Sequence, residues 1–235
     1  MIDVVGVSKR FGRLQVLDGL DLAIRPGRVT AVVGPNAAGK TTLIKILLGL
    51  TRPDAGRVLL DGQPATDDGA YRARIGYMPQ IARFPENLSA RDLLTLLARL
   101  RGGSATDESL IGEFALDAQL DKPLRTLSGG TRQKVNAVMA FLFAPDALIL
   151  DEPTAGLDPI SSSILKDRVL QERTRGRTVI IASHIMSELE ELADDVAFLL
   201  DGRIRFAGPL EELKRRTHQP SLERAIAHLM IREAA

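Results

Sequence analysis

Eight residues from Gly34 to Thr41 could bind the phosphates of a nucleotide. They read Gly-Pro-Asn-Ala-Ala-Gly-Lys-Thr, which fits the pattern G-x-x-x-x-G-K-[ST]. The backbone amides of such a loop surround the β-phosphate, and the positive end of the following helix points at it. Lys40 would neutralise the β- and γ-phosphates, and Thr41 would give its hydroxyl to Mg²⁺. We predict that the binding loop consists of Gly34, Pro35, Asn36, Ala37, Ala38, Gly39, Lys40, Thr41 and Thr42.

Two neighbouring acids could carry out chemistry at those phosphates. Asp151 and Glu152 come directly after the apolar run from Ala147 to Leu150, which reads as a strand. A strand end beside a phosphate loop is where Mg²⁺ needs an anionic anchor, and Asp151 suits that role. Glu152 points elsewhere because it is one residue on, and we expect it to act as the general base on an attacking water. An isolated Asp-Glu pair would favour a solvated turn, so the phosphate loop decides between the two readings.

The flanking sequence predicts the elements that must position these residues. Val29 to Val33 is a continuous run typical of a strand buried on both faces, and a helical pattern follows from Lys40 to Leu50. Further buried strands are predicted at Leu148 to Leu150 and at Val179 to Ala182, with helical residues 159 to 175 between them. This alternation predicts an α/β fold, with the core of a phosphate-loop nucleoside triphosphatase.

Other segments predict strands in the first third, helices in the middle and a hairpin near the end. The expected elements are a strand at 2–7, a strand at 16–24 broken by Asp18-Gly19, an edge hairpin at 57–62, helices over 87–143 with a stop at Gly102-Gly103-Ser104, a hairpin at 196–207 and a final helix at 221–231. We predict a single domain over 1–235, in which an antiparallel β subdomain joins the core. A helical subdomain would cover about 87–143, and a C-terminal helical extension about 209–235.

Composition and charge exclude several classes of protein. The net charge of +1 at pH 7, without a basic stripe, argues against a nucleic-acid partner. The absence of cysteine excludes disulfides and thiolate sites, and it fits a reducing compartment. The most apolar run, Val138 to Leu150, is interrupted by Pro145 and Asp146, and Met1 to Arg10 lacks the apolar stretch of a signal peptide. We therefore expect a soluble chain that reaches a membrane only through a partner.

Further motifs match the ATP-binding-cassette family in order and spacing, and the whole chain resembles an ATPase of that family. Leu127-Ser128-Gly129-Gly130 resembles the family signature, and Ala155-Gly156-Leu157-Asp158 resembles its D-loop. Gln80 resembles the glutamine that senses Mg²⁺, and His184 resembles the switch histidine that contacts the γ-phosphate. Phe11 sits where the family places an aromatic ring to stack on adenine. Each residue alone has an ordinary structural reading, but their joint spacing favours the family.

The resemblance implies an ATP hydrolase that uses ATP and Mg²⁺. The implied catalytic residues are Glu152, His184 and Asp158, and the implied Mg²⁺ ligands are Thr41, Gln80 and Asp151, with Gln80 and Phe11 also binding ATP. Two chains would form a head-to-tail homodimer, so that Ser128, Gly129 and Gly130 of one chain meet the ATP held by the other. A polytopic membrane permease would hold this dimer at the cytoplasmic face of the inner membrane, with a periplasmic accessory protein as a further partner.

Two positions depart from the family pattern. Ala37 replaces a common glycine of the loop, and because alanine would be strained at a positive φ, we expect a negative φ there. Thr131 replaces the usual glutamine after the signature, which puts a contact to the sugar in doubt. His218 and His228 have no chemical context, and we interpret both as structural.

Residues 127–160 and 176–230 resemble the ATPase of the copper-processing system that matures nitrous-oxide reductase. This resemblance predicts that the chain energises a permease for copper-enzyme maturation, without handling copper itself. One alternative is the ATPase of another export-type system. A second is a non-transport cassette ATPase that acts on ribosomes or DNA, although such proteins usually carry two cassettes or a long coiled-coil insert.

Overall fold

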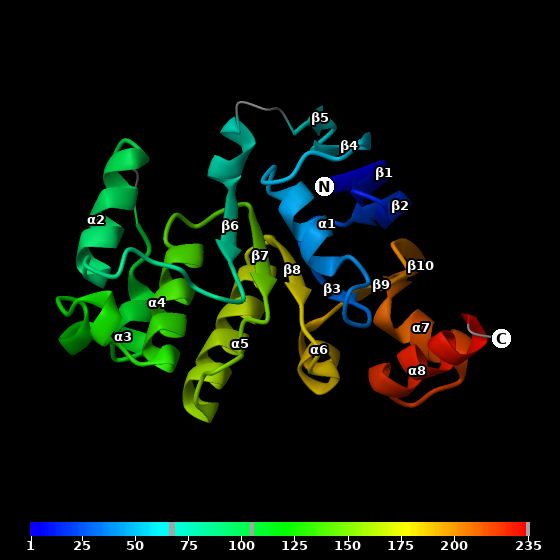
Figure 1. Cartoon of the computed structure of the whole chain (residues 1–235). Coiled ribbons are helices and arrows are strands. Elements are labelled where there is room, and N and C mark those ends of the chain that lie inside the picture. The colour runs from blue at the N-terminus through cyan, green and yellow to red at the C-terminus, as the bar shows by residue number, and fades with distance from the viewer. Residues whose placement is uncertain (66–68, 104–105, 234–235) are drawn as a thin grey trace.

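The strands form two sheets in the computed structural model, which describes residues 1–65, 69–103 and 106–233. The smaller sheet is antiparallel and has the strand order β2-β1-β4-β5. The larger sheet has the order β10-β9-β3-β8-β7-β6 and is parallel except for the β9–β10 hairpin. Helix α1 lies between the two sheets, and α5 and α6 lie on the other face of the larger sheet (Figure 1).

The strands have the following bounds: β1 Ile2–Phe11, β2 Leu14–Ile24, β3 Val29–Val33, β4 Ala55–Leu60, β5 Gln63–Pro64, β6 Ile75–Met78, β7 Ala147–Asp151, β8 Thr178–Ala182, β9 Asp195–Leu200 and β10 Arg203–Pro209. The α-helices are α1 Lys40–Leu47, α2 Ala90–Leu100, α3 Ser109–Glu113, α4 Gly129–Phe141, α5 Pro159–Thr174, α6 Met186–Leu192, α7 Leu210–Thr217 and α8 Leu222–Glu233. Short 3₁₀ helices occur at η1 Ala70–Arg74, η2 Asp117–Gln119 and η3 Leu124–Thr126.

The central strands β3, β7 and β8 are buried along their whole length. Their side chains alternate between two cores: Leu148 and Leu150 join the core that includes α4 and α5, whereas Ile149 joins the core around α1 and the smaller sheet. Cover on both faces explains the continuous apolar runs of the sequence. Because these strands are parallel, their carboxyl ends meet at one edge of the sheet.

Most expected elements are confirmed, and two details are wrong. Strand β2 is continuous through Asp18-Gly19, because register shifts against β1 absorb the irregularity. Helix α1 ends at Leu47 rather than at Leu50, since Gly49 adopts a left-handed backbone with φ of 64° just after it. The expected hairpin after β9 is present, and its turn residue Asp201 has φ of 49°.

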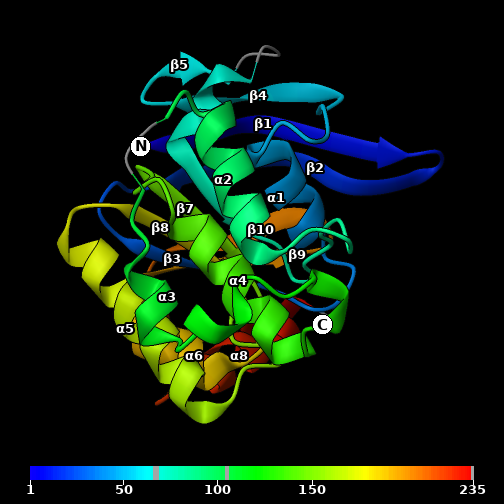
Figure 2. The same ribbon diagram turned by 90° about the vertical axis from the view of Figure 1, so that its left-hand side faces the viewer.

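The middle of the chain folds mainly into helices, as predicted. Ser89 caps α2 through a reciprocal capping box with Asp92, and Ser128 caps α4. Figure 2 shows α2, α3 and α4 together on one side of the molecule. Helix α2 ends at Leu100, before the predicted glycine stop, of which Ser104 lies outside the described residues. The division into helical subdomain and C-terminal extension stays a prediction.

A buried cluster of charges joins α5 to the start of α3. Arg168, with 3% of its side chain exposed, pairs with Asp107, donates to Ser109 Oγ at 2.9 Å and lies 3.0 Å from Glu172 Oε1. Burial opposes ionisation of Asp107, but hydrogen bonds from Ser109 and Arg168 lower the pKa of that carboxyl to about 2. The cluster therefore ties the helical segment to the α/β core.

None of the helices within the described ranges combines the length and the apolar character required to cross a bilayer.

Candidate functional site

A cavity of about 300 Å³ opens at the carboxyl edge of β3, β7 and β8. Open α/β sheets bind their ligands at this edge. The lining combines the predicted loop with residues from the strand ends and from β2: Leu14, Val16, Asn36, Ala37, Gly39, Lys40, Thr41, Thr42, Gln80, Asp151, Glu152 and His184. The fold thus brings together the loop, both acids, the glutamine and the histidine that the sequence singled out.

The two glycines of the loop motif are required by space as well as by conformation. Gly34 has φ of 159°, and a Cβ there would overlap the carbonyl oxygen of Leu199. Gly39 has φ of 108°, and a Cβ there would lie 2.7 Å from Leu17 Cδ2 and 2.9 Å from the carbonyl oxygen of Val16. Any other residue at either position would push the loop away from the strands that support it.

Ala37 overturns an expectation, because its φ is 64° rather than negative. The left-handed region places the Cβ of an L-residue too close to its own backbone, at a cost of roughly 1–2 kcal/mol. The loop therefore contains a strained alanine at a position where the family pattern has glycine.

The ammonium of Lys40 lies inside the loop. It donates hydrogen bonds to the carbonyl oxygens of Gly34 at 2.6 Å and Pro35 at 2.9 Å. Burial lowers the pKa of Lys40, while the charges of Glu152 and Asp151 oppose that shift. A cation held by two loop carbonyls near two acids is suited to bind an anionic group such as a phosphate.

Asp151 and Glu152 present their carboxylates differently, as the sequence suggested. Asp151 ends β7 and is buried, and its burial, followed by the charge of Glu152, raises its pKa. Glu152 leaves the strand with φ of 50°. Its Oε2 lies 2.8 Å from His184 Nδ1 and accepts a hydrogen bond from Ser183 Oγ at 3.1 Å. The ring of His184 is otherwise accessible, with 74% of the side chain exposed.

The donor set fits a hard cation. The hydroxyl of Thr41, the amide of Gln80 and the carboxylate of Asp151 face one cavity, and oxygen ligands of these kinds are those that Mg²⁺ prefers. The loop that carries Gln80 is anchored, because Asn136 Nδ2 of α4 donates to the carbonyl oxygen of Pro79 at 2.9 Å.

Phe11 does not line the cavity. It lies at the end of β1, is 52% exposed, and has the ammonium of Lys9 at 5.5 Å from its ring centre. Leu14 and Val16 of β2 line the cavity instead. Sequence reasoning missed both, although Val16 belongs to a strand that it predicted. Their position in the sequence, just after the β1–β2 turn, is the signal that could have identified them as lining residues.

The signature residues and Asp158 also lie outside the lining; Ser128 and Asp158 cap helices α4 and α5. Ser128 Oγ accepts a hydrogen bond from the backbone N–H of Thr131 at 3.1 Å and lies 2.8 Å from Thr131 Oγ1. Asp158 accepts from the backbone N–H of Ser161 at 2.9 Å and lies 3.1 Å from Lys134 Nζ. Hydrogen bonds from Ser161 and Lys134 lower the pKa of Asp158. The contact between Ser128 and Thr131 was not predicted.

Known proteins resemble this chain over nearly its full length. Residues 17–155 match the ABC transporter family. The daunorubicin resistance ATP-binding protein DrrA3 of Streptomyces coeruleorubidus is 38% identical over 222 residues, which cover 92% of this chain and 70% of the relative. The Nod factor export ATP-binding protein I of Burkholderia lata is 38% identical over 208 residues, which cover 86% of this chain and 68% of the relative.

Solved structures show the same fold. The structure of an ATP-binding subunit of an ABC transporter superposes with a TM-score of 0.90 at 29% identity, covering 98% of this chain and 99% of the other. A dimeric post-hydrolysis state of the cassette MJ0796, bound to ADP and Pi, gives a TM-score of 0.80 at 22% identity, over 89% of this chain and 99% of the other. The second likeness concerns the fold alone.

Proposed function

Because the chain belongs to the ABC transporter family and is an ATP-binding subunit of such a transporter, we propose that it hydrolyses MgATP in the cavity beside Lys40 and thereby drives a separate membrane permease. The family hydrolyses ATP. The observation that supports this site is the meeting of the loop ammonium of Lys40 with Asp151, Glu152 and His184 in one cavity.

Each lining residue has a role that its surroundings support. Lys40 and the loop amides would hold the β- and γ-phosphates, and Thr41, Gln80 and Asp151 would hold Mg²⁺, which neutralises charge on those phosphates. Glu152 would accept a proton from the attacking water. His184 and Ser183 fix the Glu152 carboxylate by hydrogen bonds, so it is oriented before the substrate arrives.

Ser128, Gly129 and Gly130 do not reach this cavity in their own chain, so we propose that they act on a second copy. They stand at the amino end of α4, which offers backbone amides to an anion. A Cβ on Gly130 would lie 2.9 Å from the carbonyl oxygen of Gly156, so the signature rests on the turn that precedes Asp158. In this arrangement Asp158 would position the signature of its own chain and would not touch the nucleotide of that chain.

A hollow along β6, the strand that leads to Gln80, is suited to the permease. It has a volume of about 190 Å³ and lies between β6, α2 and α4, with a lining that includes Tyr77, Leu97, Met139 and Phe143. Leu100, which ends α2 and directly precedes the lining residue Arg101, is 74% exposed. We propose that an apolar segment of the permease contacts this region, so that movement of Gln80 on MgATP binding reaches the membrane partner.

Export is the direction that the relatives support, since their names refer to daunorubicin resistance and Nod factor export. The chain would then work at the cytoplasmic face of a membrane, as a homodimer bound to its permease. Maturation of a copper enzyme, with a periplasmic accessory protein, stays a narrower proposal that rests on the sequence resemblance alone.

The proposed activity is tested with the chain and its co-encoded permease in membrane vesicles. Parent protein should hydrolyse ATP, and Lys40→Ala and Glu152→Gln should both abolish turnover while leaving thermal melting close to that of the parent. Substantial hydrolysis by either folded variant would refute the site. Co-purification with ribosomes instead of a membrane protein would refute the transport role.

The copper proposal has a separate test. Deletion of the gene should leave nitrous-oxide reductase exported but deficient in copper, and Glu152→Gln at the locus should give the same phenotype. Normal copper content and normal nitrous-oxide reduction in the deletion strain would refute this proposal and leave the ATPase assignment intact.

A further inference from the structure

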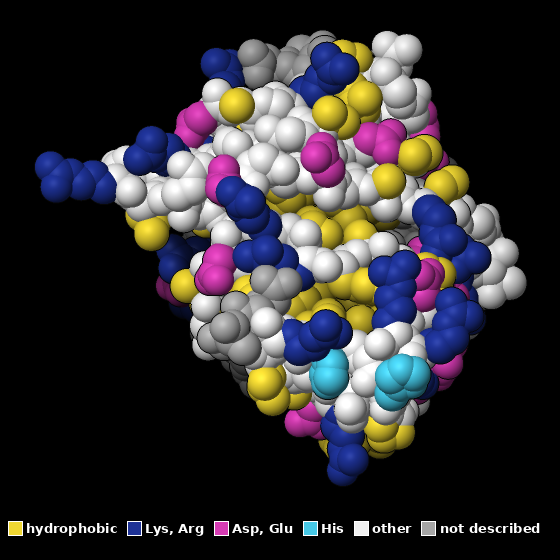
Figure 3. Space-filling view, turned by 90° about the vertical axis from the view of Figure 1, so that its right-hand side faces the viewer, with side chains coloured by type: hydrophobic (Ala, Val, Ile, Leu, Met, Phe, Trp, Pro, Cys, Tyr) yellow, Lys and Arg dark blue, Asp and Glu magenta, His cyan; other side chains and the backbone are white. Residues whose placement is uncertain are grey.

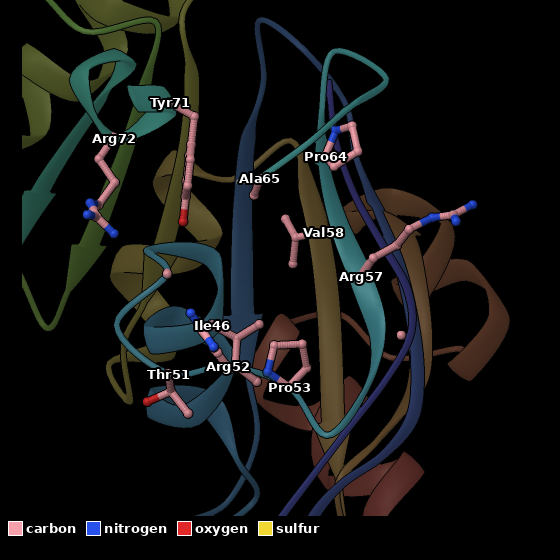
Figure 4. A pocket seen from close by; sticks show the side chains of 12 residues that line it. Ile46, Thr51, Arg52, Pro53, Arg57, Val58, Pro64, Ala65, Tyr71 and Arg72 are labelled. Carbon is pink, nitrogen blue, oxygen red and sulfur yellow. The ribbon is translucent and has the colours of Figure 1, made fainter. Parts of the chain in front are cut away.

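A second hollow lies at the opposite end of α1 from the phosphate loop. It has a volume of about 390 Å³ and is bounded by the end of α1, the turn that follows it, β4, β5 and η1. Its wall is apolar where Ile46, Pro53, Val58 and Ala65 face the ring of Tyr71 (Figure 4). This size is within the range of sites for small organic ligands, and the apolar wall is joined by several polar side chains.

One polar group in the hollow has no acceptor for its proton among the described residues. The hydroxyl of Tyr71 is buried without a hydrogen bond among the described residues. Gly49 leaves room for it, because a Cβ at Gly49 would overlap that hydroxyl and would lie 3.2 Å from Arg72 Nη1. Buried polar groups in proteins are nearly always hydrogen-bonded, so an unpartnered phenol indicates a missing acceptor.

The neighbour of this hydroxyl has no acceptor to offer. Arg72 places its guanidinium at the same point, and a guanidinium has only donors. Burial raises the pKa of Tyr71, against the charge and the side-chain contact of Arg72, so the phenol keeps its proton. Two donors, one of them cationic, therefore converge where an oxygen with negative charge would satisfy both.

Two of the three arginines among the described lining residues lie on one side of the hollow. Figure 4 shows Arg52 and Arg72 near the end of α1, together with the Tyr71 hydroxyl, whereas the side chain of Arg57 points away. The hollow thus has a donor-rich end at Tyr71 and the cationic Arg72, and an apolar body formed by Ile46, Val58 and Ala65.

We propose that this hollow binds a small organic carboxylate. Its carboxylate accepts hydrogen bonds from Tyr71 and Arg72, and its apolar body rests against Ile46 and Val58. None of the residues that line the nucleotide cavity lines this hollow. The two sites are linked by α1, which begins at Lys40 beside the phosphates and ends at Leu47 beside the hollow.

Benzoate is a suitable probe, because it combines a carboxylate with a compact apolar ring. Titration calorimetry of the full chain, with a saturating non-hydrolysable ATP analogue in the nucleotide site, should give saturable binding with a dissociation constant on the order of 1 mM. Inorganic phosphate and benzyl alcohol, tested in parallel, should each bind at least about tenfold more weakly. Equal binding of phosphate would refute the apolar contact, and equal binding of benzyl alcohol would refute the anionic one.

Variants distinguish the hollow from other surfaces. Tyr71→Phe and Arg72→Gln should each weaken benzoate binding about tenfold. Arg57→Gln is the matched control on the same rim and should bind benzoate like the parent. Without benzoate, Tyr71→Phe should melt at or above the temperature of the parent, because it removes an unpartnered buried hydroxyl. Unchanged benzoate affinity in Tyr71→Phe, or no saturable binding to the parent, would overturn the proposal.

Discussion

Ala37 has a positive φ where the sequence led us to expect a negative one. Glycine at this position should relieve the strain of φ at 64°, and the gain should exceed the entropy lost to a more flexible unfolded chain. We expect Ala37→Gly to raise the free energy of unfolding by about 0.5–1 kcal/mol. Urea unfolding measures this change.

The neighbouring Ala38 supplies the control for that substitution. Ala38 is buried, with 4% exposed, and is not among the residues with positive φ. Ala38→Gly should therefore lower stability. A loss of stability in both variants would contradict the strain at Ala37.

Thr131 gives a second prediction at the scale of single residues. Its backbone N–H and its hydroxyl both reach Ser128 Oγ. If both of these groups donate to Ser128 Oγ, the hydroxyl proton of Ser128 is available to donate to a phosphate. Thr131→Val removes only the hydroxyl, so we expect the cap of α4 to persist while KM for ATP rises about three- to tenfold.

Thr131→Ser should restore the KM of the parent, because it keeps the hydroxyl. Rates at varied ATP concentration, together with thermal melting, separate the roles. A lower melting temperature of Thr131→Val with an unchanged KM would show that Thr131 only supports the cap of α4.

At this scale the sequence predicted that the loop and both acids lie at strand ends beside one cavity, because a fixed spacing ties each to one strand; their roles stay predictions. The stacking of Phe11 on adenine stays a prediction, and the sequence missed Leu14 and Val16, which line the cavity. The direction of the β1–β2 hairpin decides which side chains face the phosphates, and no local pattern encodes that direction. The loop motif likewise does not encode the sign of φ at Ala37.

Among the elements, buried strands were the easiest to predict, since cover on both faces leaves an uninterrupted apolar run. β2 was harder. Asp18 and Gly19 look like a turn, yet register shifts against β1 carry the strand past them. The cluster around Arg168 could not be predicted, because its charges come from distant segments and resemble solvated surface charges in sequence.

The Arg168 cluster gives the prediction for the elements. Asp107 has a pKa of about 2 in the fold, below its ordinary value of 3.8, so its ionised form stabilises the fold above pH 3.8, and this contribution fades as pH falls toward 2. We expect Asp107→Asn to lower the free energy of unfolding by about 1–2 kcal/mol at pH 7, after allowance for solvent screening.

The difference between Asp107→Asn and the parent should be smaller at pH 3 than at pH 7, as measured by urea unfolding at both values. Asp121→Asn is the control, because Asp121 and its partner Arg91 are both largely exposed, and it should change stability little. An equal loss in the two variants would contradict a structural role for the buried cluster.

At the scale of the whole molecule, the proposed homodimer should become visible when hydrolysis is blocked. Glu152→Gln should still bind MgATP, and the bound nucleotide should then hold two chains together. Size-exclusion chromatography with and without MgATP measures this. The double variant Lys40→Ala/Glu152→Gln should stay monomeric, and a monomeric single variant at high protein concentration would count against the dimer.

The separation of Ser128–Gly130 from the cavity of their own chain has a genetic consequence. A chain with Lys40→Ala lacks a working loop but keeps its signature, whereas a chain with Gly130→Asp keeps its loop and lacks a signature. Neither would be active alone. Mixed in equal amounts, they should complement each other, and random pairing of two-fold dimers predicts about a quarter of the parental sites. Each active site would then be formed by two polypeptides, so two inactive alleles could together give activity.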